Sequence, residues 1–225
     1  MVARWLNAPE LFSWAQTWRR IIHCVYQAKA NPAVDRVRDG VAGNARLTGA
    51  VAAALLVLLA AEGATIPFIG SLIEPHILIG MLLIPPVLLK LGSTGYRFVR
   101  YYAGSPPYIR KGPPALPLRV LAPGVVLTTL ALFGTGVALL LAGPPSNTLV
   151  FAHKLSFIAW VGLMSLHVLG HLLEMPRLAS SDWRRNAPVE ARLAGAGTRI
   201  AALSLSLLAG ICVTLLSISA AESWL

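Results

Sequence analysis

Five apolar stretches dominate this sequence. They cover residues 47–69, 75–91, 121–141, 150–173 and 200–220. A helix that crosses the hydrocarbon core of a bilayer needs about 20 such residues, and it must pair its backbone N–H and C=O groups within itself. Only 12% of all residues are charged, against about 25% in soluble domains. The sequence therefore predicts an all-α, polytopic transmembrane helix bundle with about five spans.

Positive charge alternates along the connections between these stretches. Residues 1–46 carry seven Lys/Arg, residues 90–120 six and residues 174–199 five, whereas residues 70–74, 143–149 and 221–225 carry none. Because basic loops stay inside, we expect a multi-pass protein of the cytoplasmic (inner) membrane with its N-terminus in the cytoplasm and its C-terminus outside. The placement of basic residues in the inner loops accounts for the net charge of +10. A role in binding nucleic acid would instead need a basic face on a soluble domain.

The segments outside the spans complete the predicted organisation. Residues 8–28 carry apolar side chains at helical spacing, with Arg19 and Arg20 among them, which predicts an amphipathic helix in the cytoplasmic interface. The apolar positions are Leu11, Trp14, Trp18, Ile21, Ile22 and Val25. Packing against a partner subunit is the alternative. The first span begins too late for a cleavable signal peptide. We therefore predict an interfacial segment (1–46), one helical bundle (47–220) and a short exoplasmic tail (221–225), with residues 104–118, rich in proline, forming an extended loop.

Two pairs of polar residues lie 14 positions apart inside two of the apolar stretches: His76 with Lys90, and His153 with His167. On a helix this spacing is close to four turns, or ~21 Å along the axis. Both spans run from outside to inside, so His76 and His153 share an exoplasmic level, and Lys90 and His167 share a cytoplasmic level. Ionisable groups inside a membrane are costly and usually functional. If the spans face each other, His76 and His153 can bind one haem iron from opposite sides.

The cytoplasmic level allows two interpretations. His167 and His171 share one helix face, but only Lys90 lies opposite them. An ammonium cannot bind iron unless it loses its proton, which burial and a metal can drive. We favour a Lys90 that extends to lipid phosphates; ligation of a second haem by Lys90 and His167 is the alternative.

Other residues near His76 fit a cofactor site. Gly80 follows one turn later and leaves the backbone open to a flat macrocycle, although small residues also serve helix packing in membranes. Glu62 lies near the level of His76, where it can orient the imidazole through its distal N–H, accept protons from a quinol, or be a protonated or water-facing carboxyl. Cys24 and Cys212 form no CxxC motif, which excludes c-type haem and cysteine-ligated iron–sulfur clusters.

Histidines paired 14 residues apart on two helices of a four-to-five-helix bundle resemble the bacterial di-haem membrane cytochrome b superfamily, which includes cytochrome b561-like proteins and hydrogenase- or formate-dehydrogenase-type b subunits. The resemblance covers residues 47–175. His76, His153 and His167 occupy its ligand positions, and Lys90 departs from them. In that superfamily such pairs ligate two stacked haems, which carry electrons between quinone and a peripheral or membrane redox subunit. With the departure at Lys90, the resemblance implies one haem b at the outer level and leaves the second open.

We expect a non-catalytic electron-transfer subunit of an oxidoreductase complex. The alternative is a haem-free membrane anchor or assembly subunit. The sequence carries no phosphate loop, GxSxG or HExxH motif that would indicate soluble enzymology.

Overall fold

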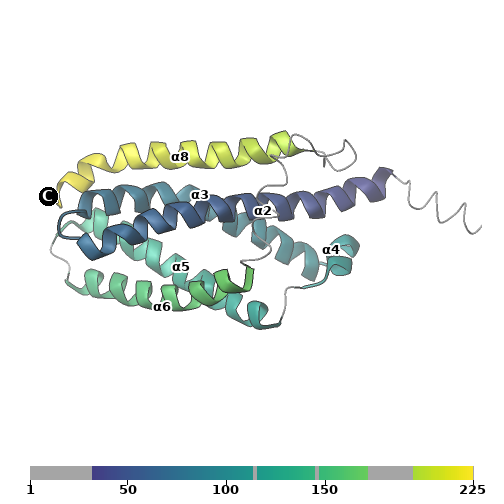
Figure 1. Cartoon of the computed structure of the whole chain (residues 1–225), viewed down its shortest axis with the longest axis horizontal. Helices are drawn as coiled ribbons and strands as arrows, with labels where there is room; N and C mark the ends of the chain where they lie inside the picture. The colour runs from purple at the N-terminus through teal and green to yellow at the C-terminus, as the bar shows by residue number, and fades with distance from the viewer. Residues whose placement is uncertain (1–31, 114–115, 145–146, 172–194, 225) are drawn as a thin grey trace, which may run out of the picture. The chain divides into compact units, whose positions relative to one another are not determined.

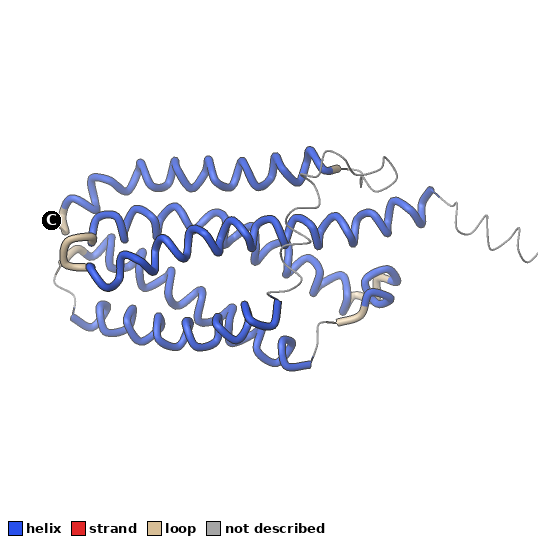
Figure 2. Tube along the Cα trace, viewed as in Figure 1, coloured by secondary structure: helices blue, strands red, loops and turns tan. Residues whose placement is uncertain are grey.

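The regular structure of the described residues is entirely helical (Figure 2). The computed structural model describes residues 32–113, 116–144, 147–171 and 195–224. Its elements in chain order are α2 (Pro32–Thr65), the 3-10 helix η1 (Ile66–Phe68), α3 (Ile73–Tyr102), α4 (Pro106–Lys111), α5 (Leu116–Ala142), α6 (Asn147–His171) and α8 (Ala196–Glu222).

Five of these helical segments are long and apolar enough to cross a membrane. They are Gly40–Phe68, Ile73–Tyr102, Leu116–Ala142, Asn147–His171 and Ala196–Glu222. The predicted all-α fold with five spans is confirmed, as expected of a multi-pass membrane protein. The amphipathic helix predicted for residues 8–28 lies outside the described residues.

The prediction of an extended loop over residues 104–118 is wrong in part. The segment contains the short helix α4, and α5 already begins at Leu116. Pro106 and Pro107 occupy the first turn of α4, where a backbone N–H has no partner within the helix and proline costs little. The helix ends at Gly112, whose φ of +76° suits glycine. The prolines therefore start a helix here instead of preventing one.

Residues Ala42–Leu225 form one compact unit, and Met1–Val41 form another whose described part is the beginning of α2. Within the first of these units, α3 packs along α8 and α5 packs along α6 (Figure 1). Val51 and Leu55 of α2 meet Leu83 of α3 in the best-buried apolar cluster of the described residues. The helices α3 and α6 thus belong to different pairs, and each contributes residues to the site described next.

The close contact between α3 and α8 depends on a proline and a glycine. Two consecutive prolines, Pro85 and Pro86, lie inside the continuous helix α3. Pro86 has no N–H to donate to Leu82 O, and α8 approaches that carbonyl so closely that a Cβ on Gly210 would lie 2.5 Å from it. One turn away, Thr214 Oγ1 of α8 donates to Leu78 O over 3.1 Å. A side chain at position 210 would therefore force the two helices apart.

Candidate functional site

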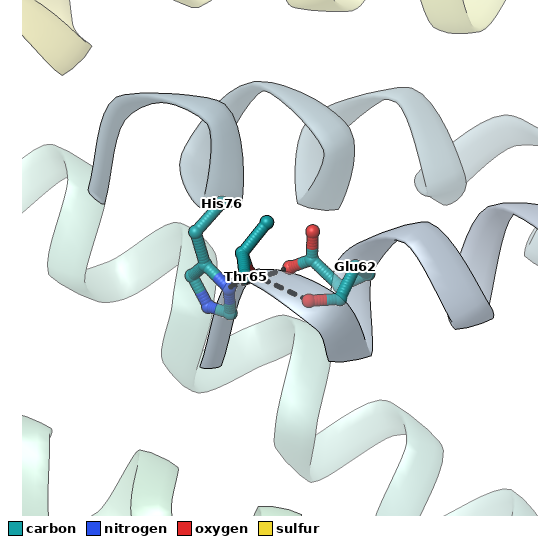
Figure 3. A network of polar contacts seen from close by, with 3 residues as sticks. All are labelled: Glu62, Thr65 and His76. Carbon is teal, nitrogen blue, oxygen red and sulfur yellow. Dashed lines mark hydrogen bonds and ion pairs between the residues drawn. The ribbon is translucent and has the colours of Figure 1, made fainter. Parts of the chain in front are cut away.

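His76 lies in the first turn of α3, and its ring is held from α2 (Figure 3). The Nδ1 atom of His76 is 2.9 Å from Thr65 Oγ1 and 3.1 Å from Glu62 Oε1. Both partners come from the last turn of α2, which the η1 turn brings beside the start of α3. The structure therefore places Glu62 beside His76, an arrangement that the sequence analysis considered. It also adds Thr65 as a partner of His76, which the sequence did not predict.

The hydrogen bonds of Thr65 fix the tautomer of His76. The Thr65 hydroxyl donates its only proton to Glu62 O over 2.6 Å, so its oxygen accepts from His76 Nδ1–H. A neutral imidazole protonated at Nδ1 carries its lone pair on Nε2. His76 therefore offers Nε2 as an acceptor or a metal ligand.

His153, on α6, has the same kind of partner on a different helix. Its Nδ1 atom is 3.0 Å from Thr135 Oγ1 of α5, and the Thr135 hydroxyl donates to Ala131 O over 2.7 Å. By the same reasoning His153 is protonated at Nδ1 and carries its lone pair on Nε2. Gly136 makes room for this ring, because a Cβ there would lie 3.3 Å from His153 Cε1.

The two imidazoles approach each other from α3 and α6. The ring centroids of His76 and His153 are 6.3 Å apart, with the ring planes nearly perpendicular. A bond from a metal to an imidazole nitrogen is about 2 Å long, so this separation leaves room for one metal ion bound to a nitrogen of each ring. The spacing in the sequence predicted equal depth, and the structure brings the two rings close together from different helices.

A cavity of about 840 Å³ opens beside both histidines. Its walls come from α2, α3, α5 and α6 and are mostly apolar, and they include Gly80 and Gly136. Cofactor pockets typically measure about 300–1,000 Å³ and are lined by apolar groups with a few polar ones. The cavity has the size and character of a site for an organic cofactor or a lipid-soluble ligand.

The remaining predicted residues lie away from this cavity. Lys90 Nζ donates to Thr48 O of α2 over 2.9 Å, and Thr48 Oγ1 in turn donates to Ser93 Oγ over 3.0 Å. No hydrogen bond joins Lys90 to His167 in the part of the chain that the structure describes. The ring centroids of His167 and His171 lie 4.9 Å apart, with the ring planes tilted by 60°. The structure thus brings Glu62, His76 and His153 together and bonds Lys90 to α2.

Neither Thr65 nor Thr135 was identified from the sequence, although each left a signal. Thr65 follows Glu62 by three residues at the end of the first apolar stretch, and Thr135 stands between Gly134 and Gly136. A hydroxyl flanked by glycines inside a span indicates close approach of another helix.

Among the described residues, no group of three or more His, Cys, Asp or Glu side chains could hold a metal ion. Comparison with family models, with curated proteins and with solved structures finds no match to this chain.

Proposed function

We propose that this chain is a membrane electron-transfer subunit that binds one b-type haem between α3 and α6, with His76 and His153 as axial ligands. The observation that carries the proposal is the arrangement of the two imidazoles. Their centroids lie 6.3 Å apart, and each Nδ1 is engaged by a threonine, so that the lone pair of each ring is on Nε2. Axial ligation of a b-type haem uses neutral imidazoles of this kind.

The residues around the histidines fit a haem in three respects. A haem iron needs only two protein ligands, because the macrocycle supplies the other four, so two histidines suffice. The wall of the cavity is apolar, which suits a macrocycle and lowers the access of water to the iron. Gly80 and Gly136 thin the wall near the two rings.

A bound haem b would supply a one-electron carrier, and the protein would supply its position and surroundings. His76 and His153 would hold the iron through Nε2. Thr65 and Thr135 keep each imidazole in the tautomer that can ligate, the role that hydrogen-bonding partners of ligands commonly play. Glu62 Oε1 lies 3.1 Å from His76 Nδ1 and would help Thr65 to orient the imidazole.

We further propose that electrons pass between the quinone pool and a peripheral or membrane redox subunit. Support comes from the resemblance of the histidine spacing to membrane b cytochromes and from the position of both histidines near one end of their spans. The loop charges favour an inner-membrane protein with its N-terminus in the cytoplasm and the haem toward the outer face. Lys90, bonded to Thr48 O, leaves the cytoplasmic level without a second pair of ligands.

A reduced-minus-oxidised absorbance spectrum of the purified protein tests the proposal. Wild-type protein should show a b-type band, and both His76→Ala and His153→Ala should lose it, because each removes one axial bond from the same iron. The control His23→Ala should keep the band, since we expect that histidine at the interface. Size-exclusion elution of each variant shows whether it is still folded. A folded wild-type protein with no b-type band after expression with haem would favour the haem-free anchor.

A further inference from the structure

Two of the residues that line the cavity have buried polar atoms without a partner. Three buried side-chain atoms in the described residues lack a hydrogen bond: Glu62 Oε2, His167 Nδ1 and Trp224 Nε1. Glu62 and Trp224 line the cavity, whereas His167 does not. Buried donors and acceptors nearly always find partners, so an unpaired one calls for an explanation. A ligand in the cavity that accepts a hydrogen bond is the simplest partner for the indole N–H of Trp224.

Trp224 is held in place by the end of α8. Its backbone N–H donates to Ala221 O over 3.0 Å, and the neighbouring Ser223 Oγ donates to Ala220 O over 2.7 Å. This turn sets the indole against the same cavity that Ile69 and Ile73 line between α2 and α3. Figure 1 shows the end of the chain beside that connection. The unpaired indole N–H, which can only donate, thus belongs to the outer end of the cavity.

A cation lies at the same cavity. Lys154 follows His153 directly on α6, is exposed, and lines the cavity wall. It is the only Lys or Arg between Arg119 and Arg177, so it stands apart from the basic connections. A lysine keeps its ammonium in a polar place while its stem lies along apolar surface. Such a cation suits the acidic end of an otherwise apolar ligand.

We propose that Trp224 and Lys154 bind the carboxylate groups of the cavity's ligand, one through the indole N–H and the other through the ammonium. This inference rests on the proposed function and deepens it, because haem b carries two carboxylates on one edge of its ring. Carboxylates only accept hydrogen bonds, so they pair with these two donors and not with Glu62 Oε2. The carboxylate edge of the ligand therefore faces the outer end of the cavity, which Ile66 of η1 and Trp224 after α8 both line.

The test compares haem b with haem b dimethyl ester, in which both carboxylates are blocked. Wild-type protein, Trp224→Phe, Lys154→Gln and the double variant are each loaded with both compounds. The rate of transfer to a haem-scavenging globin is then measured. Charge-assisted hydrogen bonds predict that wild-type protein releases the ester at least on the order of 10-fold faster than haem. Each single variant should reduce this preference and the double variant should abolish it. Arg110→Gln, on α4 and outside the cavity, is the matched control and should keep the preference.

The outcomes separate this inference from the proposed function. Wild-type protein that binds both compounds and releases them at equal rates overturns the carboxylate site and leaves the haem proposal standing. A double variant that still prefers haem over the ester has the same meaning. Wild-type protein that binds neither compound overturns the proposed function and this inference together. Because release is measured relative to the ester in the same variant, a general loosening of the fold would speed both rates and leave their ratio unchanged.

Discussion

The threonine partners of the histidines give the sharpest prediction. Thr135→Val keeps the shape of the side chain and removes the oxygen that lies 3.0 Å from His153 Nδ1. Without that acceptor, nothing favours the tautomer protonated at Nδ1 over the tautomer protonated at Nε2. The latter cannot bind a metal through Nε2. Loss of such a partner typically costs 10–100-fold in affinity, or about 1.4–2.8 kcal/mol. An unpaired buried N–H costs about 1–3 kcal/mol, so two independent routes give the same magnitude.

The assay is the rate of haem release from Thr135→Val into a scavenging globin, and Thr128→Val is its control. Thr128 lies on the same helix and bonds only to backbone carbonyls of that helix, Gly124 O at 2.8 Å and Val125 O at 3.3 Å. We expect release at least 10-fold faster for Thr135→Val and near the wild-type rate for Thr128→Val. Equal release from the two variants, in a protein that loses its haem in His153→Ala, would refute the tautomer argument.

Three further predictions concern packing, stoichiometry and topology. Gly210→Ala should lower the free energy of unfolding in mixed micelles by about 1–3 kcal/mol through overpacking against α3, whereas Gly134→Ala, with no atom near the added methyl, should not; equal stabilities would contradict the close contact of α3 with α8. Lys90→Met should leave about one b haem per chain by pyridine haemochrome analysis, because the ammonium bonds to a carbonyl of α2; two haems, one of them lost in the variant, would reinstate Lys90 as a ligand. Reporter fusions should place residues 104–118 in the cytoplasm and residues 143–149 outside, and the opposite result would reverse the charge argument.

The number and approximate lengths of the spans could be predicted from the sequence because they depend on quantities that vary little. The rise per residue of a helix fixes the level of His76 and of His153 once the direction of each span is known. The length of each apolar stretch fixes how many times the chain crosses the bilayer. The prediction for residues 104–118 was wrong because proline has opposite effects at two positions of a helix. It disrupts the interior of a helix but is well tolerated in the first turn.

Rotation about each helix axis could not be predicted in the same way. A span that is apolar all round offers no pattern to say which face meets a neighbour, and lipid does not drive burial of one face as water does. Thr65 and Thr135 act from helices other than those of the histidines that they contact, so no spacing within a single span reveals them. The same holds for Lys90, whose partner Thr48 lies on α2.

The fit between Gly210 and the Leu82 carbonyl bears on how the protein is made. A ribosome delivers α3 to the membrane well before α8, so for a time the carbonyl that Pro86 leaves without its usual donor meets neighbours other than α8. Acyl chains offer such a carbonyl no hydrogen bond. Insertion of α8 therefore gives α3 a close backbone neighbour at Leu82 O and a side-chain donor at Leu78 O, as well as adding a span. A stop codon within α8 should consequently destabilise the second span, and cellular quality control should remove the product even though its first four spans are intact.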